Sequence, residues 1–363
     1  MCAYPVLIAI GALFAYKYTA KNTKLTVENV NSTYDYIIIG AGSARCVLAA
    51  RLSEDPNNRV LLLEAGGEET DNANISIPAA ALSVWNTLSD WIYSATQQRN
   101  SGFAQIGDEN RHYWPRGKGI GGSNNLNIMQ YVRGSRYDYD EWEDQGCDGW
   151  GYDDVLPYFL KSEDIRIDDL KNSRFHNSGG SLAVIKDTVF FLFGIVLLME
   201  ERSWIGFGGS QVNVREGARG STAAQFLRPS MGRSNLHVVV NAHVTTVVID
   251  NKVATGVAFI KDNRKQIVSA VVVDLPVGQN MENHIYSFIP ATMNTSEGLT
   301  GPKVESLSSI GQYLIFGTGP LSTTGLVGTA FIKSSKCKTK YPEIQCHLLA
   351  TLLIQELAKY SEK

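Results

Sequence analysis

Apolar runs separated by glycine-rich turns predict a strand–helix–strand unit near the start of the chain. Residues 34–39 form a short run rich in β-forming residues that is typical of a strand buried on both faces. A glycine turn occupies 40–45, and 46–53 have the composition and spacing of a helix. Residues 54–58 break that helix, and the apolar run at 59–64 predicts a second buried strand. This order of elements is that of a dinucleotide-binding unit.

The turn has the residues that a diphosphate-binding loop needs. Gly40 permits a tight turn out of the first strand, and Gly42 lets amide hydrogens at the helix N-terminus approach a pyrophosphate. Glu64 lies 24 residues beyond Gly40, where it is placed to accept hydrogen bonds from ribose hydroxyls. A G-x-G-x-x-G pattern alone is a weak signal, but two flanking strands and the acid make it a strong one.

The glycine turn departs from the dinucleotide-binding pattern at one position. Arg45 stands where a third glycine lets the helix pack closely on the strand. Its side chain either tilts the helix and weakens the site, or turns outward and meets phosphate. If the helix is displaced, Arg45→Gly is expected to tighten retention of the cofactor.

A second glycine cluster lies in residues 113–134. Its glycines are followed by short polar side chains and then by an apolar stretch. A loop that cradles a phosphate or a flavin has this composition, because its backbone amides approach the ligand closely. The alternative, a glycine-rich surface loop, leaves the many apolar and aromatic neighbours unexplained.

Composition excludes several classes of protein. The chain has 363 residues, 44% of them apolar and 19% charged, so it has enough apolar residues for a large core and is not intrinsically disordered. A net charge of −3 provides no basic field for a nucleic-acid backbone, so no nucleic-acid partner is expected. The five cysteines include no C-x-x-C pair, and no metal site is expected.

The N-terminal segment has a distinct character. Residues 3–16 carry no charge, and lysines follow at 17, 21 and 24. Such a run is shorter than the roughly 20 residues of a spanning helix and has the length of a secretory h-region. We therefore expect residues 1–33 to be a signal or anchor with a linker, and the protein to be secreted or membrane-tethered. The alternative is a buried first helix.

Taken together, several segments resemble the glucose–methanol–choline (GMC) oxidoreductases, in particular the insect glucose-dehydrogenase-like branch. The similar segments, in the family's order, are 34–67, 115–134, 137–142, 149–159, 217–229, 235–247 and 274–280. The resemblance implies an α/β fold with a Rossmann-like FAD/NAD(P)-binding domain and a second, substrate-binding α+β domain. It also implies FAD as cofactor, an alcohol or sugar as substrate, and a quinone or other electron acceptor.

The resemblance further implies which residues bind the cofactor. These are Gly40, Gly42 and Ser43 at the pyrophosphate; Glu64 and the adjacent Ala65 at the adenosine ribose; Arg116, Gly117, Gly121, Gly122, Ser123 and Asn127 beside the flavin; and Val244 at the adenine. No metal ligand is assigned.

The family's division into domains is expected here in incomplete form. Residues 34–160 and 206–285 correspond to the FAD-binding domain, and 161–205 and 286–363 to part of the substrate-binding region. The C-terminal block with the family's catalytic histidine is expected to be absent, so no catalytic residue is assigned. The histidines match family positions that are not catalytic, or none: His112, His176, His237, His243, His284 and His347.

Two interior segments also depart from the family. Its second signature has no counterpart where Val271 follows Ala270, and an apolar run at 189–199 stands in place of a longer connection. That run is too short to span a bilayer, so we interpret it as a core helix or a splicing artefact. Deletions of this kind are typical of a mispredicted or decayed gene model. A chain without this much core is expected to aggregate or to need a partner.

Three functional hypotheses follow. The leading one is an FAD-dependent oxidoreductase of the CH–OH class that is similar to glucose dehydrogenase. The second is a non-catalytic flavin-binding remnant. The third, an NAD-dependent enzyme, is weak because it gives no role to the loop at 121–127.

Overall fold

A three-stranded parallel sheet forms the first part of the structure. In spatial order its strands are β1 (Tyr36–Ile39), β2 (Val60–Leu63) and β11 (Leu236–Val239). Helix α2 (Ser43–Leu52) connects β1 to β2. The predicted strand–helix–strand unit is therefore confirmed, and its helix begins three residues earlier than the sequence pattern indicated. The prediction that the first strand is buried on both faces is wrong, because β1 is an edge strand in which Tyr36 and Ile39 are 42% and 38% exposed.

Alternate residues of β2 face opposite layers of this part. Val60 and Leu62 pack with apolar residues of α2. Leu61 and Leu63 pack against an antiparallel β-meander on the other face. All four side chains are at most 1% exposed, which explains why this strand is a continuous apolar run.

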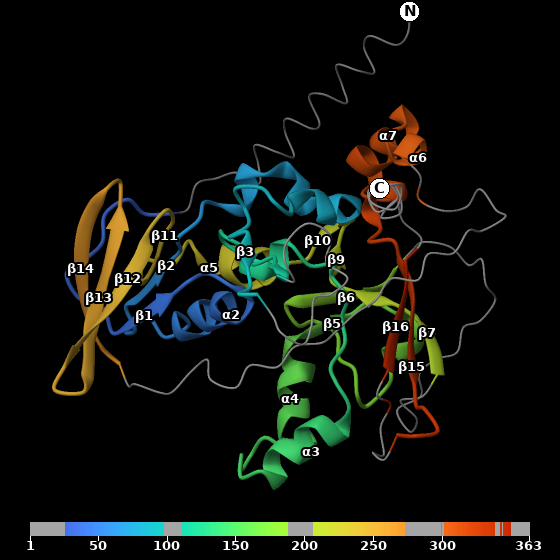
Figure 1. Ribbon diagram of the computed structural model, residues 1–363, viewed down its shortest axis with the longest axis horizontal. Helices are drawn as coiled ribbons and strands as arrows, with labels where there is room; N and C mark the ends of the chain where they lie inside the picture. Colours follow the sequence, from blue (N-terminus) through green and yellow to red (C-terminus); the bar gives the residue numbers. More distant parts are fainter. Residues whose placement is uncertain are drawn as a thin grey trace, which may run out of the picture.

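The meander consists of β12 (His243–Asp250), β13 (Val253–Lys261) and β14 (Arg264–Val272). The first part therefore has three layers, in the order helix, parallel sheet, meander, and Figure 1 shows the meander at its outer edge. Strand β14 includes both Ala270 and Val271, between which the sequence analysis expects the family's second signature to be missing, and its pairing with β13 shifts register between Ser269 and Val272. The expected departure from the family thus falls inside a strand, at an irregularity in its pairing.

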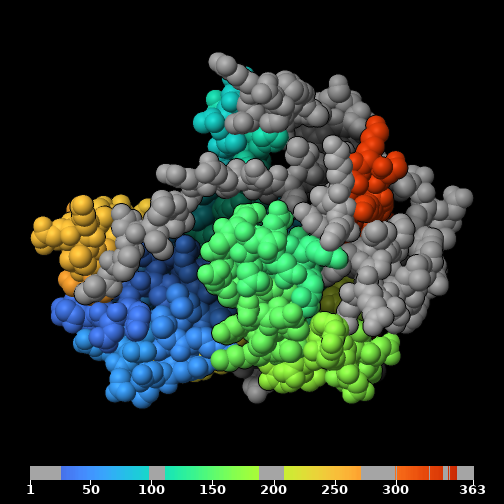
Figure 2. Space-filling view, turned by 90° about the horizontal axis from the view of Figure 1, so that it is seen from below, coloured from blue at the N-terminus to red at the C-terminus, as the bar shows by residue number. Residues whose placement is uncertain are grey.

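A second part contains two further sheets and two pairs of helices. One sheet has the order β5 (Glu163–Ile165), β6 (Leu182–Lys186), β8 (Gln211–Val212), and the other the order β16 (Ile344–Leu349), β15 (Leu326–Ile332), β7 (Gly206–Gly209). The helices are α3 (Arg136–Asp144), α4 (Tyr152–Ser162), α6 (Gly301–Val304) and α7 (Leu307–Phe316). Figure 2 shows α3 and α4, in green, between the blue N-terminal elements and the yellow-green strands.

Short elements complete the described fold. They are β3 (Tyr93–Ser94), β4 (Tyr113–Trp114), β9 (Val214–Arg215), β10 (Ala218–Arg219), α5 (Arg228–Ser230), a π-helical turn at Ala223–Leu227, and 3₁₀ turns at Glu69–Asp71, Ala73–Ser76, Pro78–Val84, Gly122–Asn125, Asp168–Leu170 and Pro320–Ser322.

The computed structural model describes residues 26–97, 111–187, 206–272, 299, 301–337, 342 and 344–349. The apolar segments at 3–16 and 189–199, the similar segment at 274–280, and His284 lie outside these residues. Among the described helices, none is both long enough and apolar enough to cross a membrane.

Candidate cofactor-binding site

The two glycine clusters that the sequence singled out are in direct contact. The amide of Gly121 donates a hydrogen bond to the carbonyl of Ala41 at 2.8 Å. A Cβ atom on Gly122 would lie 2.7 Å from Cα of Gly42. Segments about 80 residues apart in the sequence therefore form one backbone junction at the carboxyl end of β1.

The second loop requires glycine for steric reasons. Gly121 and Gly122 have φ angles of +103° and +55°, in the region that L side chains rarely adopt. A Cβ atom on Gly117 would lie 2.0 Å from the carbonyl oxygen of Gly122. The density of glycine in this loop is therefore explained in part by its own packing.

Gly42 is different, because no atom occupies the space that its side chain would take. It precedes α2 with a φ angle of −71°, and a Cβ atom there would meet no atom within 4 Å. The first turn of α2 contains no acidic residue, and the side chain of Ser43 is exposed. The first amides of a helix have no intrahelical acceptor and carry its positive dipole end. This open space beside a helix N-terminus fits a diphosphate.

Glu64 joins three backbone segments at this junction. The residue is 5% exposed, and its carboxylate accepts hydrogen bonds from the amides of Ala41 at 2.7 Å, Gly66 at 2.8 Å and Gly119 at 2.9 Å. A carboxylate has about four lone-pair positions, so one remains for another donor. The predicted contact with a ribose hydroxyl stays a prediction. The structural role was not visible in the sequence, because its donors come from separate segments.

The remaining residues of the predicted flavin-side loop lie close together. Ser123 Oγ accepts from the Gly117 amide at 3.3 Å. Asn127 is exposed, and its Oδ1 accepts from the Met129 amide at 3.1 Å. The exposed Arg116 guanidinium lies 5.1 Å from the ring centroid of its neighbour, Trp114.

The residues predicted to lie beside the adenine are close to the carboxyl end of β11. After this strand the Ala242 amide donates to the carbonyl of Glu64 at 2.8 Å. Val244 follows two residues later on β12, where it pairs with Phe259. Ala65 is partly buried next to Glu64. The structure therefore places Val244 and Ala65 near the same end of the sheet as the glycine turn.

Arg45 does not displace α2. Cys46 and Ala49, which follow it on the helix, are fully buried, and the thiol of Cys46 donates to the carbonyl of Ala41 at 3.1 Å. The Arg45 side chain is exposed, and its Nη1 lies 3.1 Å from the position that a Cβ atom on Gly40 would take. The condition under which Arg45→Gly would tighten cofactor retention is therefore not met.

Asp90 is a residue of this region that the sequence interpretation missed. It is buried and accepts hydrogen bonds from the Tyr113 hydroxyl and from the amides of Arg116, Ile92 and Asn86 at 3.0–3.1 Å. Burial alone would raise the pKa of Asp90, but these donors outweigh burial and lower it. Asp90 thus fixes the start of the second glycine loop. An isolated aspartate in a loop gives no sequence signal for this role.

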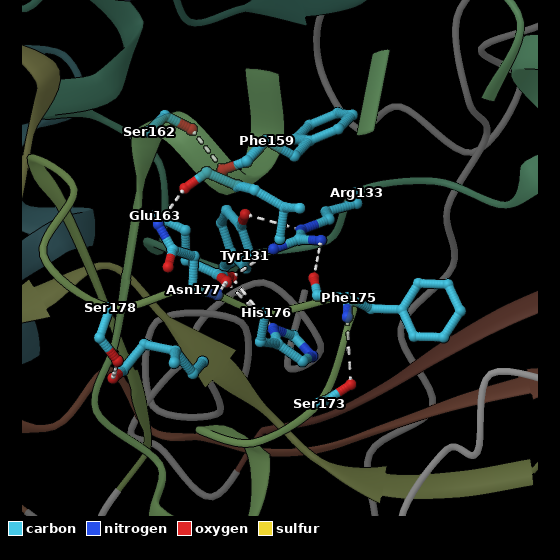
Figure 3. Close-up of polar contacts among 12 residues, drawn as sticks. Tyr131, Arg133, Phe159, Ser162, Glu163, Ser173, Phe175, His176, Asn177 and Ser178 are labelled. Atoms are coloured by element: carbon cyan, nitrogen blue, oxygen red, sulfur yellow. Dashed lines mark hydrogen bonds and ion pairs between the residues drawn. The ribbon is translucent and has the colours of Figure 1, made fainter. Parts of the chain in front are cut away.

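A buried ionic cluster lies in the second part of the structure (Figure 3). Glu163 has a fully buried side chain, and Arg133 Nη2 lies 2.7 Å from its Oε1. His176 Nδ1 lies 3.1 Å from Oε2, and the Asn177 amide donates to the same oxygen at 3.0 Å. Arg133 Nε also donates to the Tyr131 hydroxyl at 3.0 Å. The cluster connects three segments of the chain, and its histidine has a structural partner.

Glu163 is expected to make the free energy of unfolding depend on pH at acidic pH. Burial alone would raise the pKa of Glu163, but the hydrogen bond from His176 and the charge of Arg133 outweigh it and lower the pKa. Because the folded pKa lies below the unfolded one, the stabilisation is present above the unfolded pKa and is lost as the pH falls through the folded pKa. Glu163→Gln is expected to reduce the free energy of unfolding by about 2 kcal/mol at neutral pH.

Urea unfolding at a series of pH values checks this prediction. The wild-type free energy of unfolding should fall more steeply than that of Glu163→Gln below the ordinary glutamate pKa of about 4.3. The matched control is Asp168→Asn, which removes an exposed acid paired with Lys171. Equal slopes for wild type and Glu163→Gln would contradict the assignment.

The described histidines and acids do not assemble a metal centre. Within the described ranges no group of three or more His, Cys, Asp and Glu side chains is placed to hold a metal ion. His237 Nδ1 lies 2.7 Å from the Tyr34 hydroxyl. The rings of His243 and Trp91 meet edge to face at 5.7 Å.

The sheet and the glycine turn define the class of protein to which this chain belongs. A parallel sheet, an open glycine turn at a helix N-terminus and an acid after the second strand are those of a dinucleotide-binding Rossmann-like protein. The family model described as GMC oxidoreductase matches residues 34–278. The chain belongs to this family of oxidoreductases, whose members bind FAD.

Individual relatives agree with this assignment. Glucose dehydrogenase (FAD, quinone) of Drosophila pseudoobscura pseudoobscura is 35% identical over 344 residues, which cover 81% of this chain and 54% of that protein. Mitochondrial choline dehydrogenase of Homo sapiens is 31% identical over 382 residues, which cover 88% and 62%. A formate oxidase structure from Aspergillus oryzae has a TM-score of 0.73 and 19% identity, covering 90% of this chain and 70% of that one, and shows the fold. The chain thus spans little more than half the length of the first relative.

Proposed function

We propose that this chain binds FAD at the junction of the two glycine loops and acts in the oxidation of a CH–OH group of an alcohol or sugar. The observation that carries the proposal is the open space at Gly42, beside the N-terminus of α2 and against the loop at 117–127. A ligand in which a diphosphate is linked to a flat ring system suits these two neighbouring loops.

The residues present fit the cofactor. Gly42 and Ser43 would hold the diphosphate through backbone amides, and the remaining lone pair of Glu64 would accept from the ribose. When bound, FAD supplies the capacity to accept a hydride from the donor carbon. The protein contributes the orientation of the cofactor and the backbone donors at the loop.

The names of relatives support the substrate class. One relative is a glucose dehydrogenase and another a choline dehydrogenase, so the shared chemistry is oxidation of an alcohol carbon. A quinone or another acceptor would then take the electrons, as the name of the first relative states for that protein. We also propose that residues 1–33 direct secretion or membrane tethering, on the basis of the uncharged run at 3–16.

Purification with excess FAD tests the proposal. The protein is expected to be yellow, with flavin absorption bands that remain after gel filtration, and the bands should bleach under anaerobic glucose, choline or a simple alcohol. Colourless protein would overturn the proposal. Coloured protein that no alcohol or sugar bleaches would support the alternative, a flavin-binding chain without catalytic activity.

Arg45 is expected to assist this site. Its guanidinium is exposed over the Gly40 turn, and in the described part of the chain it forms no salt bridge, so its charge is available to a diphosphate. Arg45→Gln should therefore weaken FAD binding about threefold to tenfold at low salt, and less at high salt. Fluorescence titration measures the affinity. Arg45→Lys should retain most of it, and Arg51→Gln, at the other end of α2, should not change it.

A further inference from the structure

Arg219 is a buried arginine that contacts the second glycine loop. The residue is 5% exposed, and its Nη1 donates to the carbonyls of Asn124 at 2.8 Å and Asn127 at 2.7 Å. The same nitrogen lies 3.0 Å from Oδ1 of Asn127. Its Nε donates to the carbonyl of Ile75 at 2.7 Å. Arg219 therefore connects the last residues of the loop to the 3₁₀ turn at Ala73–Ser76.

Among the described residues, no acid neutralises the charge of Arg219. No salt bridge to Arg219 occurs within the described ranges, and its buried Nη2 has no hydrogen-bond acceptor there. Burial lowers the pKa of Arg219 to about 10. A buried charge held only by carbonyl dipoles is costly, so a purely structural reason for keeping it is weak.

Arg228 provides a comparison on the same stretch of chain. Its side chain is also mostly buried, but it forms ion pairs with Glu68 at 3.1 Å and Glu69 at 2.5 Å. These pairs connect parts of the fold and complete its charge balance. Arg219 differs because its hydrogen bonds to the second glycine loop are made with Asn124 and Asn127 and not with an acid.

A second contact from the same segment acts on the same loop. The amide of Thr222 donates to Oδ1 of Asn124 at 2.9 Å. The backbone carbonyl and the side chain of Asn124 are thus both held from residues 219–222, while Asn127 is held at its carbonyl and its amide oxygen. No donor among these contacts reaches the turn at 40–43.

We propose that Arg219 is a positioning residue that holds residues 124–127 in the conformation that receives the flavin half of FAD. The inference rests on the proposed function, in which this loop lies beside the flavin and the 40–43 turn holds the diphosphate. Loss of Arg219 contacts should therefore affect the flavin half of the cofactor and leave the ADP half bound as before.

Paired titrations with FAD and with ADP test the inference. Arg219→Met should raise the FAD dissociation constant about tenfold or more and change the ADP dissociation constant less than about twofold. Arg219→Lys keeps the charge but lacks the planar fork, so its FAD affinity should be intermediate. The visible circular dichroism of bound flavin should change in both variants, since the surroundings of the ring would be altered.

The control is Arg228→Met, which should lower thermal stability without changing the ratio of FAD to ADP affinity. Equal weakening of FAD and ADP by the Arg219 variants, or an unchanged ratio, would overturn the inference. If Arg219→Met does not fold, the affinity ratio and dichroism of Arg219→Lys decide the question. A wild-type protein that binds no FAD would instead overturn the proposed function, so the two failures are distinguishable.

Discussion

Gly42→Ala is expected to weaken FAD binding about 100-fold while the unliganded protein stays folded. The backbone at Gly42 has a φ angle of −71°, which alanine adopts readily, and the new methyl group would meet no atom within 4 Å. The fold therefore tolerates the methyl group, with a cost of about 1 kcal/mol or less for alanine at the residue preceding a helix. A diphosphate drawn to the amides of α2 would meet the methyl group and lose several charge-assisted hydrogen bonds.

Fluorescence titration with FAD and thermal unfolding of the apoprotein together check this prediction. Gly122→Ala is the informative companion, because its Cβ atom would lie 2.7 Å from Cα of Gly42 and its φ angle is +55°. That variant should lose both stability and FAD binding. Gly232→Ala, where a Cβ atom meets nothing within 4 Å, should change neither. Wild-type FAD affinity in Gly42→Ala would show that the diphosphate does not lie at this turn.

Glu64→Ala is expected to lower the free energy of unfolding of the apoprotein by about 4 kcal/mol, because three buried amides lose their acceptor. The donors belong to Ala41, Gly66 and Gly119. Glu64→Gln should cost about half as much. Its remaining oxygen can keep the two donors at Gly66 and Gly119, whereas its NH₂ group would face the Ala41 amide.

Urea unfolding measures the effect in the absence of any cofactor. Glu54→Ala is the matched control, since Glu54 is an exposed glutamate paired with Arg51 and should change the free energy of unfolding by no more than about 0.5 kcal/mol. If Glu64→Ala were no more destabilising than Glu54→Ala, Glu64 would not be the residue that joins the two glycine loops.

The two predictions separate the two roles at this junction. The Gly42→Ala variant adds a methyl group to the space proposed for the diphosphate and leaves the contacts within the protein intact. The Glu64 variant removes protein contacts that exist without a ligand. A residue inferred from a dinucleotide motif can therefore serve the fold as well as the cofactor, and only separate measurements of stability and affinity distinguish these contributions.

The elements of the first part could be predicted because their signals are local. The strand at Val60–Leu63 is buried on both faces, and this alone requires a continuous apolar run. Glycine in the turn at 40–42 and an acid after the second strand follow from the needs of a diphosphate and a ribose. The start of α2 was placed three residues late, because a glycine before a helix is also compatible with a longer turn.

The sequence by itself therefore determined the strand–helix–strand unit, the two glycine loops and the family resemblance, since each depends on residues close together in the chain. Only the tertiary structure decided that the loops touch at Gly42 and Gly122, that Arg45 leaves the helix in place, and that Arg219 holds Asn124 and Asn127. The contact between Gly42 and Gly122 and the contacts of Arg219 join residues roughly 80 to 100 positions apart, and most of the atoms that they meet are backbone atoms. Because every residue has the same backbone amide and carbonyl, side-chain identity carries no signal for such pairs.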